Sequence, residues 1–299
     1  MAYARTNKFD DTFAVCRTKR IGSWQCRAIV VLHVAYKVFM NVVWQQRKDL
    51  LMSEQDLSGK VVLVTGAARR IGAAIVTRLH ANGARVAIHY RNSVDEADTL
   101  ASRLNKDRAE SATTFQADLL DVEQIPRLVT AVTDWGGRLD ALVNNASTFY
   151  PTPVGSITEA HWEDLIGSNL KAPLFLSQAA APHLRANRGA IVNIVDIHSR
   201  RPLRNHAVYG PAKAGLAMLT RSLAKDLAPQ IRVNGVSPGA ILWPEEGMSD
   251  AAQRSILQQV PLQRPGDPDD IAGCVLYLLR NASYVTGQII AVDGGRSIG

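Results

Sequence analysis

The sequence predicts an α/β fold in which a parallel sheet is covered by helices on both faces. Two observations support this prediction. From Leu57 to the end of the chain, seven β-prone runs alternate with stretches of helical pattern, and the first run leads through a glycine turn into a helix. Strands that alternate with helices form right-handed βαβ units, whose strands are parallel and buried on both sides. We therefore expect residues 57–299 to form one doubly wound domain.

Each of the seven runs is rich in valine, isoleucine and other residues that favour a buried strand. The strands are expected at residues 60–65, 84–89, 112–116, 139–144, 190–195, 231–236 and 288–292. The composition, 46% hydrophobic and 20% charged over 299 residues, is that of an ordinary globular chain with ample length for a large core.

Residues 1–56 do not share this alternation. Their apolar stretch, 28–44, is interrupted by His33, Lys37 and Asn41 and is shorter than the roughly 20 residues of a membrane-spanning helix. Two interpretations stay open. The segment is an amphipathic extension that rests on the body or is poorly ordered, or it lies outside the native protein, because Met52 resembles a natural start. No function is assigned to it.

The charge and the cysteines narrow the possible partners. Of the formal net charge of +7, +4 lies in residues 1–56, which hold nine Lys/Arg and five Asp/Glu. The body has no basic patch interleaved with aromatic residues, so a cofactor phosphate is a simpler anionic partner than a nucleic acid. Cys16, Cys26 and Cys274 form neither a CxxC pair nor a Cys/His cluster. We expect no metal, no disulfide framework and a reducing cytoplasm.

The first strand leads into a turn that indicates a dinucleotide site. Gly66 permits a tight turn, and Gly72 lets the helix that Arg70 and Ile71 open pack closely on the sheet. The amino end of that helix then faces a pyrophosphate. The middle position of the usual three-glycine pattern is Arg70. The alternative is a simple β–α turn.

The end of the second strand helps to choose the cofactor. An NAD site usually offers an acidic side chain there, which bonds the ribose 2′-hydroxyl. This chain has Arg91, Asn92 and Ser93 instead, a cation and hydrogen-bond donors that suit a 2′-phosphate. The segment favours NADP, and the alternative is a solvated loop arginine.

Further turns carry candidate cofactor contacts. After the third strand, Asp118 and Leu119 are placed to bond the edge of an adenine ring. After the fourth, the small side chains of Asn145, Ala146 and Ser147 allow close approach of the backbone to a cofactor.

Tyr209 and Lys213 are the candidate proton donor and its partner. They are four residues apart, which places them on one face of the helix expected here. A tyrosine releases its proton poorly at neutral pH because its pKa is about 10, and a nearby ammonium is expected to lower that pKa. Such a pair alone is a weak signal and needs a hydride donor beside it.

Together these motifs resemble the short-chain dehydrogenase/reductase family over residues 57–299. The motifs are Thr65-Gly66…Gly72, Asn144-Asn145-Ala146, Asn169, Tyr209…Lys213 and Ser237-Pro238-Gly239. The resemblance implies a Rossmann-type sheet and a nicotinamide cofactor. It also implies that Tyr209 donates a proton, that Lys213 bonds the nicotinamide ribose, and that Pro238 and Gly239 lie near the carboxamide.

Two departures from the family pattern indicate the pteridine reductase branch. Asp196 replaces the usual serine thirteen residues before the tyrosine, and Arg70 replaces the middle glycine. The resemblance implies that Phe149 stacks on a pterin, that Arg70 reaches the cofactor phosphates and the substrate, and that Asp196 pairs with Tyr209 in proton transfer. The alternatives are an Asp196 paired with a cation such as Arg200 or Arg201, and a Phe149 that is plain core.

The sequence therefore predicts an NADPH-dependent reductase of dihydrobiopterin-like pterins, of dihydrofolate, or of both. A carbonyl reductase of the same family, of 3-oxoacyl or steroid type, and a non-catalytic NADP-binding regulator are the alternatives. Trp243 follows Pro238-Gly239 and is a candidate for the pterin-tail pocket. The helical stretches 169–184 and 208–227 carry apolar residues on more than one face, and the family commonly forms tetramers through them. We expect a cytoplasmic homotetramer that contacts neither membrane nor nucleic acid.

Overall fold

The computed structural model describes residues 36, 37, 39–41, 57–241 and 249–298. The chain divides into two compact units, Met1–Gln55 and Asp56–Gly299. In the first unit the described residues are helical and exposed. None of the helices that the structure describes has both the length and the apolar character that crossing a bilayer requires.

The second unit is built on a seven-stranded sheet in the order β3-β2-β1-β4-β5-β6-β7, in which every neighbouring pair is parallel. The strands are β1 (Val61–Val64), β2 (Arg85–Tyr90), β3 (Ala112–Gln116), β4 (Ala141–Asn144), β5 (Ala190–Ile194), β6 (Arg232–Pro238) and β7 (Ile289–Val292). The predicted fold class is confirmed. Both ends of β3 are as predicted, and the other strands differ from prediction by one or two residues at one or both ends, because a hydrophobic run does not mark where the last ladder hydrogen bond forms.

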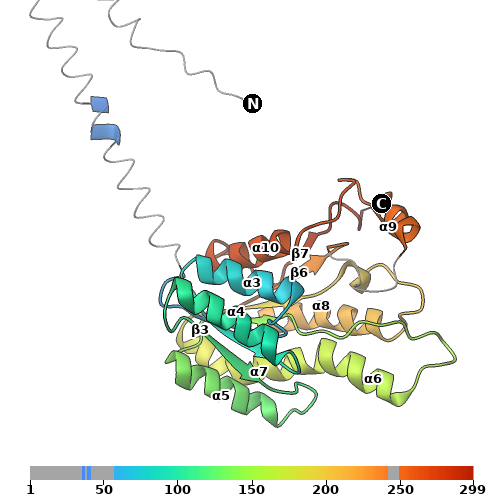
Figure 1. Cartoon of the computed structure of the whole chain (residues 1–299), viewed down its shortest axis with the longest axis horizontal. Coiled ribbons are helices and arrows are strands. Elements are labelled where there is room, and N and C mark those ends of the chain that lie inside the picture. The colour runs from blue at the N-terminus through green and yellow to red at the C-terminus, as the bar shows by residue number, and fades with distance from the viewer. Residues whose placement is uncertain (1–35, 38, 42–56, 242–248, 299) are drawn as a thin grey trace, which may run out of the picture. The chain divides into compact units, whose positions relative to one another are not determined.

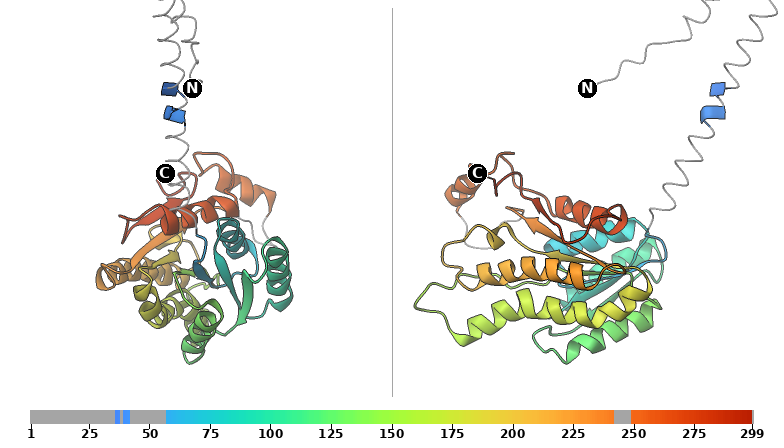
Figure 2. Two further views of the ribbon diagram at one scale, coloured as in Figure 1. Left: turned by 90° about the vertical axis from the view of Figure 1, so that its left-hand side faces the viewer. Right: turned by 180° about the vertical axis from the view of Figure 1, so that it is seen from behind.

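Helices cover both faces of this sheet (Figures 1 and 2). One layer contains α3 (Arg70–Ala81), α4 (Val94–Asp107) and α10 (Pro268–Arg280). The opposite layer contains α5 (Gln124–Gly136), α7 (Ala172–Ala186) and α8 (Tyr209–Asp226). The remaining helical segments are α6 (Glu159–Ile166), the π-helical turn η1 (Gly167–Lys171), the 3-10 turn η2 (Ile197–Ser199) and α9 (Asp250–Leu257).

Strand β1 shows why its sequence is apolar throughout. Val62 and Val64 pack in the cluster beneath α3 and α10, whereas Val61 and Leu63 pack in the cluster beneath α5 and α7. Successive side chains of a strand point to opposite faces, so a strand covered on both sides buries all of them.

The strand order positions the site. The chain moves outward from β1 to β3 and then returns to the other side of β1 with β4. In open sheets of this kind ligands bind in the crevice at the carboxyl ends of the strands where the order reverses. At that edge the chain leaves the sheet after each of the strands β1 to β5.

Candidate active site

The glycine turn after β1 lies against the turn after β4. Gly66 has a φ of +57°, and a Cβ there would lie 2.8 Å from the Cα of Ala146. A Cβ on Gly72 would lie 2.2 Å from the carbonyl oxygen of Gly66. The Asn145 amide nitrogen donates to the carbonyl oxygens of Thr65 and Gly66, both at 2.9 Å. The backbones approach closely because these positions lack side chains.

Arg70 stands at the amino end of α3 with a φ of +55°. That left-handed conformation costs a non-glycine residue about 1 kcal/mol or more, which explains why glycine is usual at this position. Strained residues of this kind persist where the surrounding structure fixes them, and they are frequent at ligand sites.

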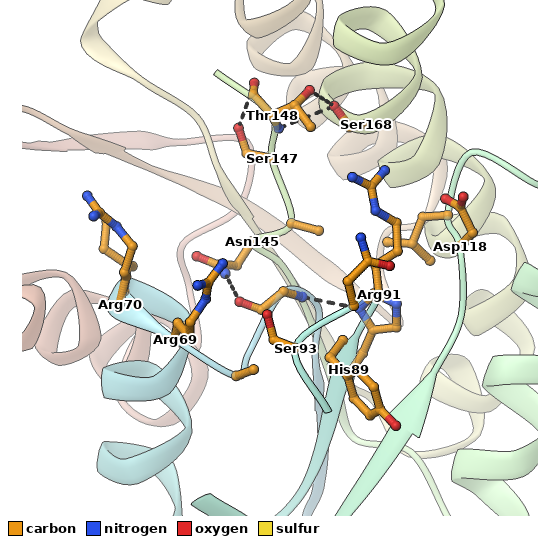
Figure 3. Close-up of a pocket in the computed structure, with 18 of the residues that line it drawn as sticks. Arg69, Arg70, His89, Arg91, Ser93, Asp118, Asn145, Ser147, Thr148 and Ser168 are labelled. Atoms are coloured by element: carbon orange, nitrogen blue, oxygen red, sulfur yellow. Dashed lines mark hydrogen bonds between the residues drawn. The ribbon is translucent and has the colours of Figure 1, made fainter. Parts of the chain in front are cut away.

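A pocket of about 400 Å³ opens between these turns. Arg69 and Arg70 lie on one side of it and Arg91 and Asp118 on the other (Figure 3). The predicted cofactor residues that line it are Gly66, Arg70, Ile71, Gly72, Arg91, Asn92, Ser93, Asp118, Leu119, Asn145, Ala146 and Ser147. A cradle without side chains at the glycines, with a cation and polar groups at the far end, fits a dinucleotide.

Sequence reasoning missed part of this lining. Ala68, Arg69, His89, Tyr90, Leu120, Thr148 and Ser168 also face the pocket. Thr148 and Ser168 carry no motif, and His89 reads as an ordinary strand residue in the sequence. The turns that bring them together are far apart in the chain, so only the fold reveals the contact.

The predicted proton-transfer residues meet at the carboxyl end of β5. The Tyr209 hydroxyl donates to Oδ2 of Asp196 at 2.8 Å, and the backbone amide of His198 donates to Oδ1 at 2.8 Å. Lys213, one turn along α8 and 2% exposed, donates from Nζ to the carbonyl oxygen of Ile194 at 2.9 Å. Asp196 thus contacts Tyr209, as the sequence predicts for proton transfer, and its carboxylate is fixed from two sides.

One expectation about this group was wrong. Lys213 was expected to lower the pKa of Tyr209, but burial, the charge of Asp196 and the hydrogen bond to it raise that pKa well above 10.0, and Ser147 opposes them only in part. Burial lowers the pKa of Lys213 itself to about 8. Desolvation of a phenol beside a carboxylate disfavours the phenolate more than a lysine bonded elsewhere can favour it.

Phe149 lies beside this group and is 52% exposed, so it is not plain core. Its ring packs edge to face with Tyr209, with 4.8 Å between the ring centroids, and stacks on His206 at 4.7 Å and 18°. His206 was not identified from the sequence, where nothing indicates that it faces an aromatic ring. Phe149 therefore offers an exposed aromatic ring beside the ring of Tyr209.

Asn169 lies in the π-helical turn η1 and forms hydrogen bonds to the loop that follows β4. Its Nδ2 donates to the carbonyl oxygens of Thr148 at 2.9 Å and Leu165 at 3.0 Å, and its Oδ1 accepts from Ser147 Oγ at 2.7 Å. Ser147 thus joins the pocket lining to the group around Tyr209.

Two further predictions concern the loop after β6. Gly239 packs against Asp293, whose Cβ would lie 2.6 Å from an added Cβ, and Pro238 ends β6. Neither belongs to the lining of the described pocket. The candidate Trp243 falls outside the described residues.

The fold and this site define a class. A glycine turn at the reversal point of a parallel sheet, with a Tyr…Lys pair on the helix after β5, is the arrangement of a nicotinamide-dependent oxidoreductase. A family model described as enoyl-(acyl carrier protein) reductase matches residues 66–297, and the chain belongs to the short-chain dehydrogenase/reductase family.

Particular relatives lie within this family. The chain is 40% identical to pteridine reductase 1 of Leishmania tarentolae, over 80% of this chain and 96% of that protein. It is 37% identical to an uncharacterized oxidoreductase of Methylorubrum extorquens, over 80% of this chain and 98% of the relative. It is 36% identical to a 3-oxoacyl-(acyl-carrier-protein) reductase of Staphylococcus aureus, over 79% of this chain and 97% of that protein. The resemblance to pteridine reductases predicted from the sequence is thereby confirmed.

Proposed function

We propose that this oxidoreductase is an NADPH-dependent pteridine reductase that converts dihydropterins, dihydrofolate or both to their tetrahydro forms. The observation that carries the proposal is the 2.8 Å hydrogen bond from Tyr209 to Asp196 beside the exposed ring of Phe149. Similarity to pteridine reductase 1 supports it. Similarity to a 3-oxoacyl reductase makes carbonyl reduction the alternative that an experiment must separate.

The reaction adds a hydride to a ring carbon and a proton to the adjacent ring nitrogen. The hydride would come from NADPH, which would leave as NADP⁺. Tyr209 holds its proton firmly at neutral pH, because burial and Asp196 raise its pKa. The proton passes from the Tyr209 hydroxyl to the substrate nitrogen, and Asp196 orients that hydroxyl and returns a proton from solvent to the phenolate. A serine at position 196 would offer a hydrogen bond but no such relay.

The substrate ring lies against Phe149, whose position beside Tyr209 brings a stacked ring to the proton donor. A bicyclic heterocycle binds to an aromatic face at low ordering cost. Arg70 contacts both the cofactor phosphates and the substrate from the amino end of α3.

The pocket between the turns would hold NADPH. Gly66, Ile71 and Gly72 would hold the pyrophosphate, whereas Arg91, Asn92 and Ser93 would bind the 2′-phosphate and make NADPH preferred over NADH. Asp118 and Leu119 would contact the adenine, and Asn145, Ala146 and Ser147 would line the middle of the cofactor. Lys213 and Tyr209 would bond the nicotinamide ribose, and Pro238 and Gly239 are proposed to lie near the carboxamide.

Exposed apolar side chains on α7 and α8 support assembly of the chain into a homotetramer. Leu174 on α7 is 39% exposed and Met218 on α8 is 61% exposed, although both helices also bury an apolar face in the core. We place the enzyme in the cytoplasm and give residues 1–56 no part in catalysis.

A substrate panel tests the proposal. The purified chain is assayed for NADPH oxidation with dihydrobiopterin, dihydrofolate and an acetoacetyl thioester, and each reaction is repeated with NADH. We expect turnover of at least one pterin with NADPH. Turnover of the thioester alone would overturn the proposal in favour of a carbonyl reductase. NADPH binding without turnover of any compound would favour a regulator.

Asp196→Ser separates the two enzymes more sharply. General acid–base groups contribute about 10²–10⁴ in rate, so pterin reduction should fall at least about 100-fold if the carboxylate relays the proton. A carbonyl reductase should tolerate the serine or gain from it. Tyr209→Phe is the matched control, since it keeps the ring packed on Phe149, removes the hydroxyl and should abolish turnover of either substrate.

A further inference from the structure

His89 lies at the carboxyl end of β2 between two turns of the cofactor pocket, and it is 2% exposed. The amide of Gly66 donates to Nδ1 of the imidazole at 3.1 Å. Nε2 lies 3.1 Å from the carbonyl oxygen of Ala117, in the turn after β3. The ring therefore bridges the glycine turn and the turn that carries Asp118.

These two partners fix the state of the imidazole. An amide N–H can only donate and a carbonyl oxygen can only accept. Nδ1 must therefore be the unprotonated nitrogen, and Nε2 must carry the hydrogen. A second proton, on Nδ1, would remove the acceptor for Gly66 and place two N–H groups against each other. The bridge exists only in the neutral Nε2–H tautomer.

The backbone of β2 strengthens the same connection. The carbonyl oxygen of His89 accepts from the amide of Ala67 at 2.8 Å, and the carbonyl oxygen of Tyr90 accepts from the amide of Ala117 at 3.1 Å. The strand end thus binds the turn after β1 on one side and the turn after β3 on the other. The turns after β1, β2 and β3 all contribute residues to the lining of the pocket (Figure 3).

We propose that His89 is a positioning residue for the dinucleotide, acting through the Gly66 amide to hold the glycine turn in its binding conformation. The inference rests on the proposed binding of NADPH in this pocket. The Nδ1–Gly66 bond sets the orientation of the peptide at φ +57°, and α3 begins four residues further along, at Arg70. Loss of the bond leaves a partly buried N–H without its protein partner and frees the turn.

Electrostatics favour the required state. Burial lowers the pKa of His89 to about 4, and the carboxylate of Asp118 and the bond to Ala117 oppose this shift only in part. The imidazole therefore stays neutral at physiological pH, and the bridge is intact whenever the protein is folded under those conditions.

Three substitutions test the proposal by NADPH binding alone, measured by fluorescence titration without a second substrate. His89→Asn places an amide oxygen where Nδ1 lies and keeps the acceptor for Gly66, so its Kd should stay within about threefold of the native value. His89→Gln keeps a donor toward Ala117 but loses that acceptor, and His89→Leu loses both. Both should bind NADPH about tenfold more weakly, because the partly buried Gly66 amide loses its acceptor in both variants.

His80→Leu is the matched control. His80 is also buried, on α3, where its Nε2 lies 2.7 Å from Ser111 Oγ, outside the pocket lining. Its loss should lower the melting temperature and leave the Kd for NADPH unchanged. A native Kd for NADPH in His89→Leu would overturn the proposal. Weakened NADPH binding in His89→Asn together with native binding in His89→Gln would also overturn it.

If His89→Leu does not fold, a measurement on the native protein still tests the proposal. Nitrogen NMR of labelled histidine should show His89 as the neutral Nε2–H tautomer at pH 5.5, with and without NADPH. A ring that titrates near 6.5, or an Nδ1–H tautomer, would overturn the proposal. Because none of these readouts involves turnover, each is independent of whether a pterin or a thioester is reduced.

Discussion

Tyr209 and Lys213 show how burial changes the chemistry of a pair that a sequence identifies by spacing. The spacing correctly predicts one helical face, but it carries no information on desolvation. Both side chains are almost fully buried, so the pKa of the tyrosine rises and that of the lysine falls to about 8. His89 and His206 were missed for a related reason, since their partners are distant in the chain and no motif marks them.

The lowered pKa of Lys213 predicts an alkaline limit to activity. Above a pH of about 8 the free enzyme loses this ammonium, and with it the charged hydrogen bond that Lys213 is proposed to donate to the nicotinamide ribose. We expect kcat/KM to fall above that pH with one apparent pKa near 8. In Lys213→Arg the guanidinium stays charged, so whatever activity remains should lack this limb.

Deprotonation of Lys213 does not unfold the protein, so unfolding caused by this residue cannot explain a fall in kcat/KM above pH 8. The folded pKa of about 8 lies below the ordinary 10.5, so between these values the unfolded chain binds more protons. The contribution of Lys213 to stability therefore rises with pH across that window. An alkaline limb that persists unchanged in Lys213→Arg would contradict the assignment.

At the scale of elements, the strand–turn–helix units were predictable because local pattern and tertiary packing agree. The seven strands occur where β-prone runs lie, and the turn from β1 to α3 follows its glycines. The π-helical turn η1 between α6 and α7 was not predicted. Its conformation depends on Asn169 bonding to Thr148 across the site, a tertiary contact that periodicity cannot reveal.

Two glycines on packed helices give opposite predictions for the same substitution. A Cβ on Gly72 of α3 would lie 2.2 Å from the Gly66 carbonyl oxygen and 2.7 Å from Asn145 Nδ2, so Gly72→Ala must displace the cofactor turn. A Cβ on Gly273 of α10 would meet only the end of the Arg78 side chain, at 3.9 Å. We expect Gly72→Ala to weaken NADPH binding at least tenfold.

Gly273→Ala is the control, because alanine in a helix interior is more stable than glycine by roughly 0.5–1 kcal/mol. It should raise the midpoint of thermal unfolding slightly and leave NADPH affinity unchanged. Native NADPH affinity in Gly72→Ala would show that the close approach of α3 to the turn is not needed for binding.

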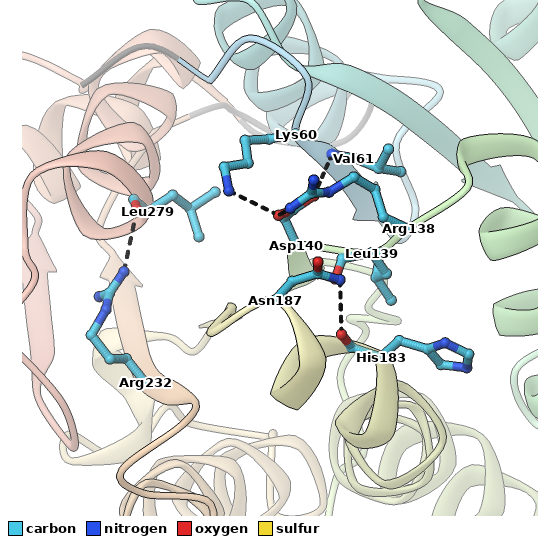
Figure 4. Close-up of polar contacts among 9 residues, drawn as sticks. All are labelled: Lys60, Val61, Arg138, Leu139, Asp140, His183, Asn187, Arg232 and Leu279. Carbon is cyan, nitrogen blue, oxygen red and sulfur yellow. Dashed lines mark hydrogen bonds and ion pairs between the residues drawn. The ribbon is translucent and has the colours of Figure 1, made fainter. Parts of the chain in front are cut away.

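Across the whole molecule, the two edges of the sheet have different roles. The carboxyl edge gathers the pocket and the Asp196–Tyr209 pair, whereas the amino edge holds an ion cluster around the buried Asp140 (Figure 4). Asp140, 7% exposed, accepts from Lys60 Nζ at 3.1 Å, from the Val61 amide at 3.0 Å and from Arg138 at 2.7 and 2.6 Å. Nothing in the sequence identified this cluster, since its members come together only when β1 and β4 pair.

The position of this cluster predicts that Asp140 affects stability and not function. Burial would raise the pKa of Asp140, but Arg138, the Val61 amide and Lys60 outweigh it and hold the pKa below 3.8. The carboxylate therefore stabilises the fold above that pH, and the stabilisation is lost as pH falls through the folded pKa. Asp140→Asn leaves two cations without a charge partner at the end of the sheet.

Removing one partner of a buried ion pair lowers the free energy of unfolding by about 3–5 kcal/mol. The side chains of Lys60 and Arg138 are 40% and 39% exposed, so solvent screening should reduce this loss to about 2 kcal/mol. Denaturant unfolding at pH 7 should show this loss, and the difference from the native protein should shrink in acid. NADPH affinity and kcat should be unchanged, because the cluster lies at the edge opposite the pocket. A variant as stable as the native chain, or one with impaired NADPH binding, would contradict this division between the two edges.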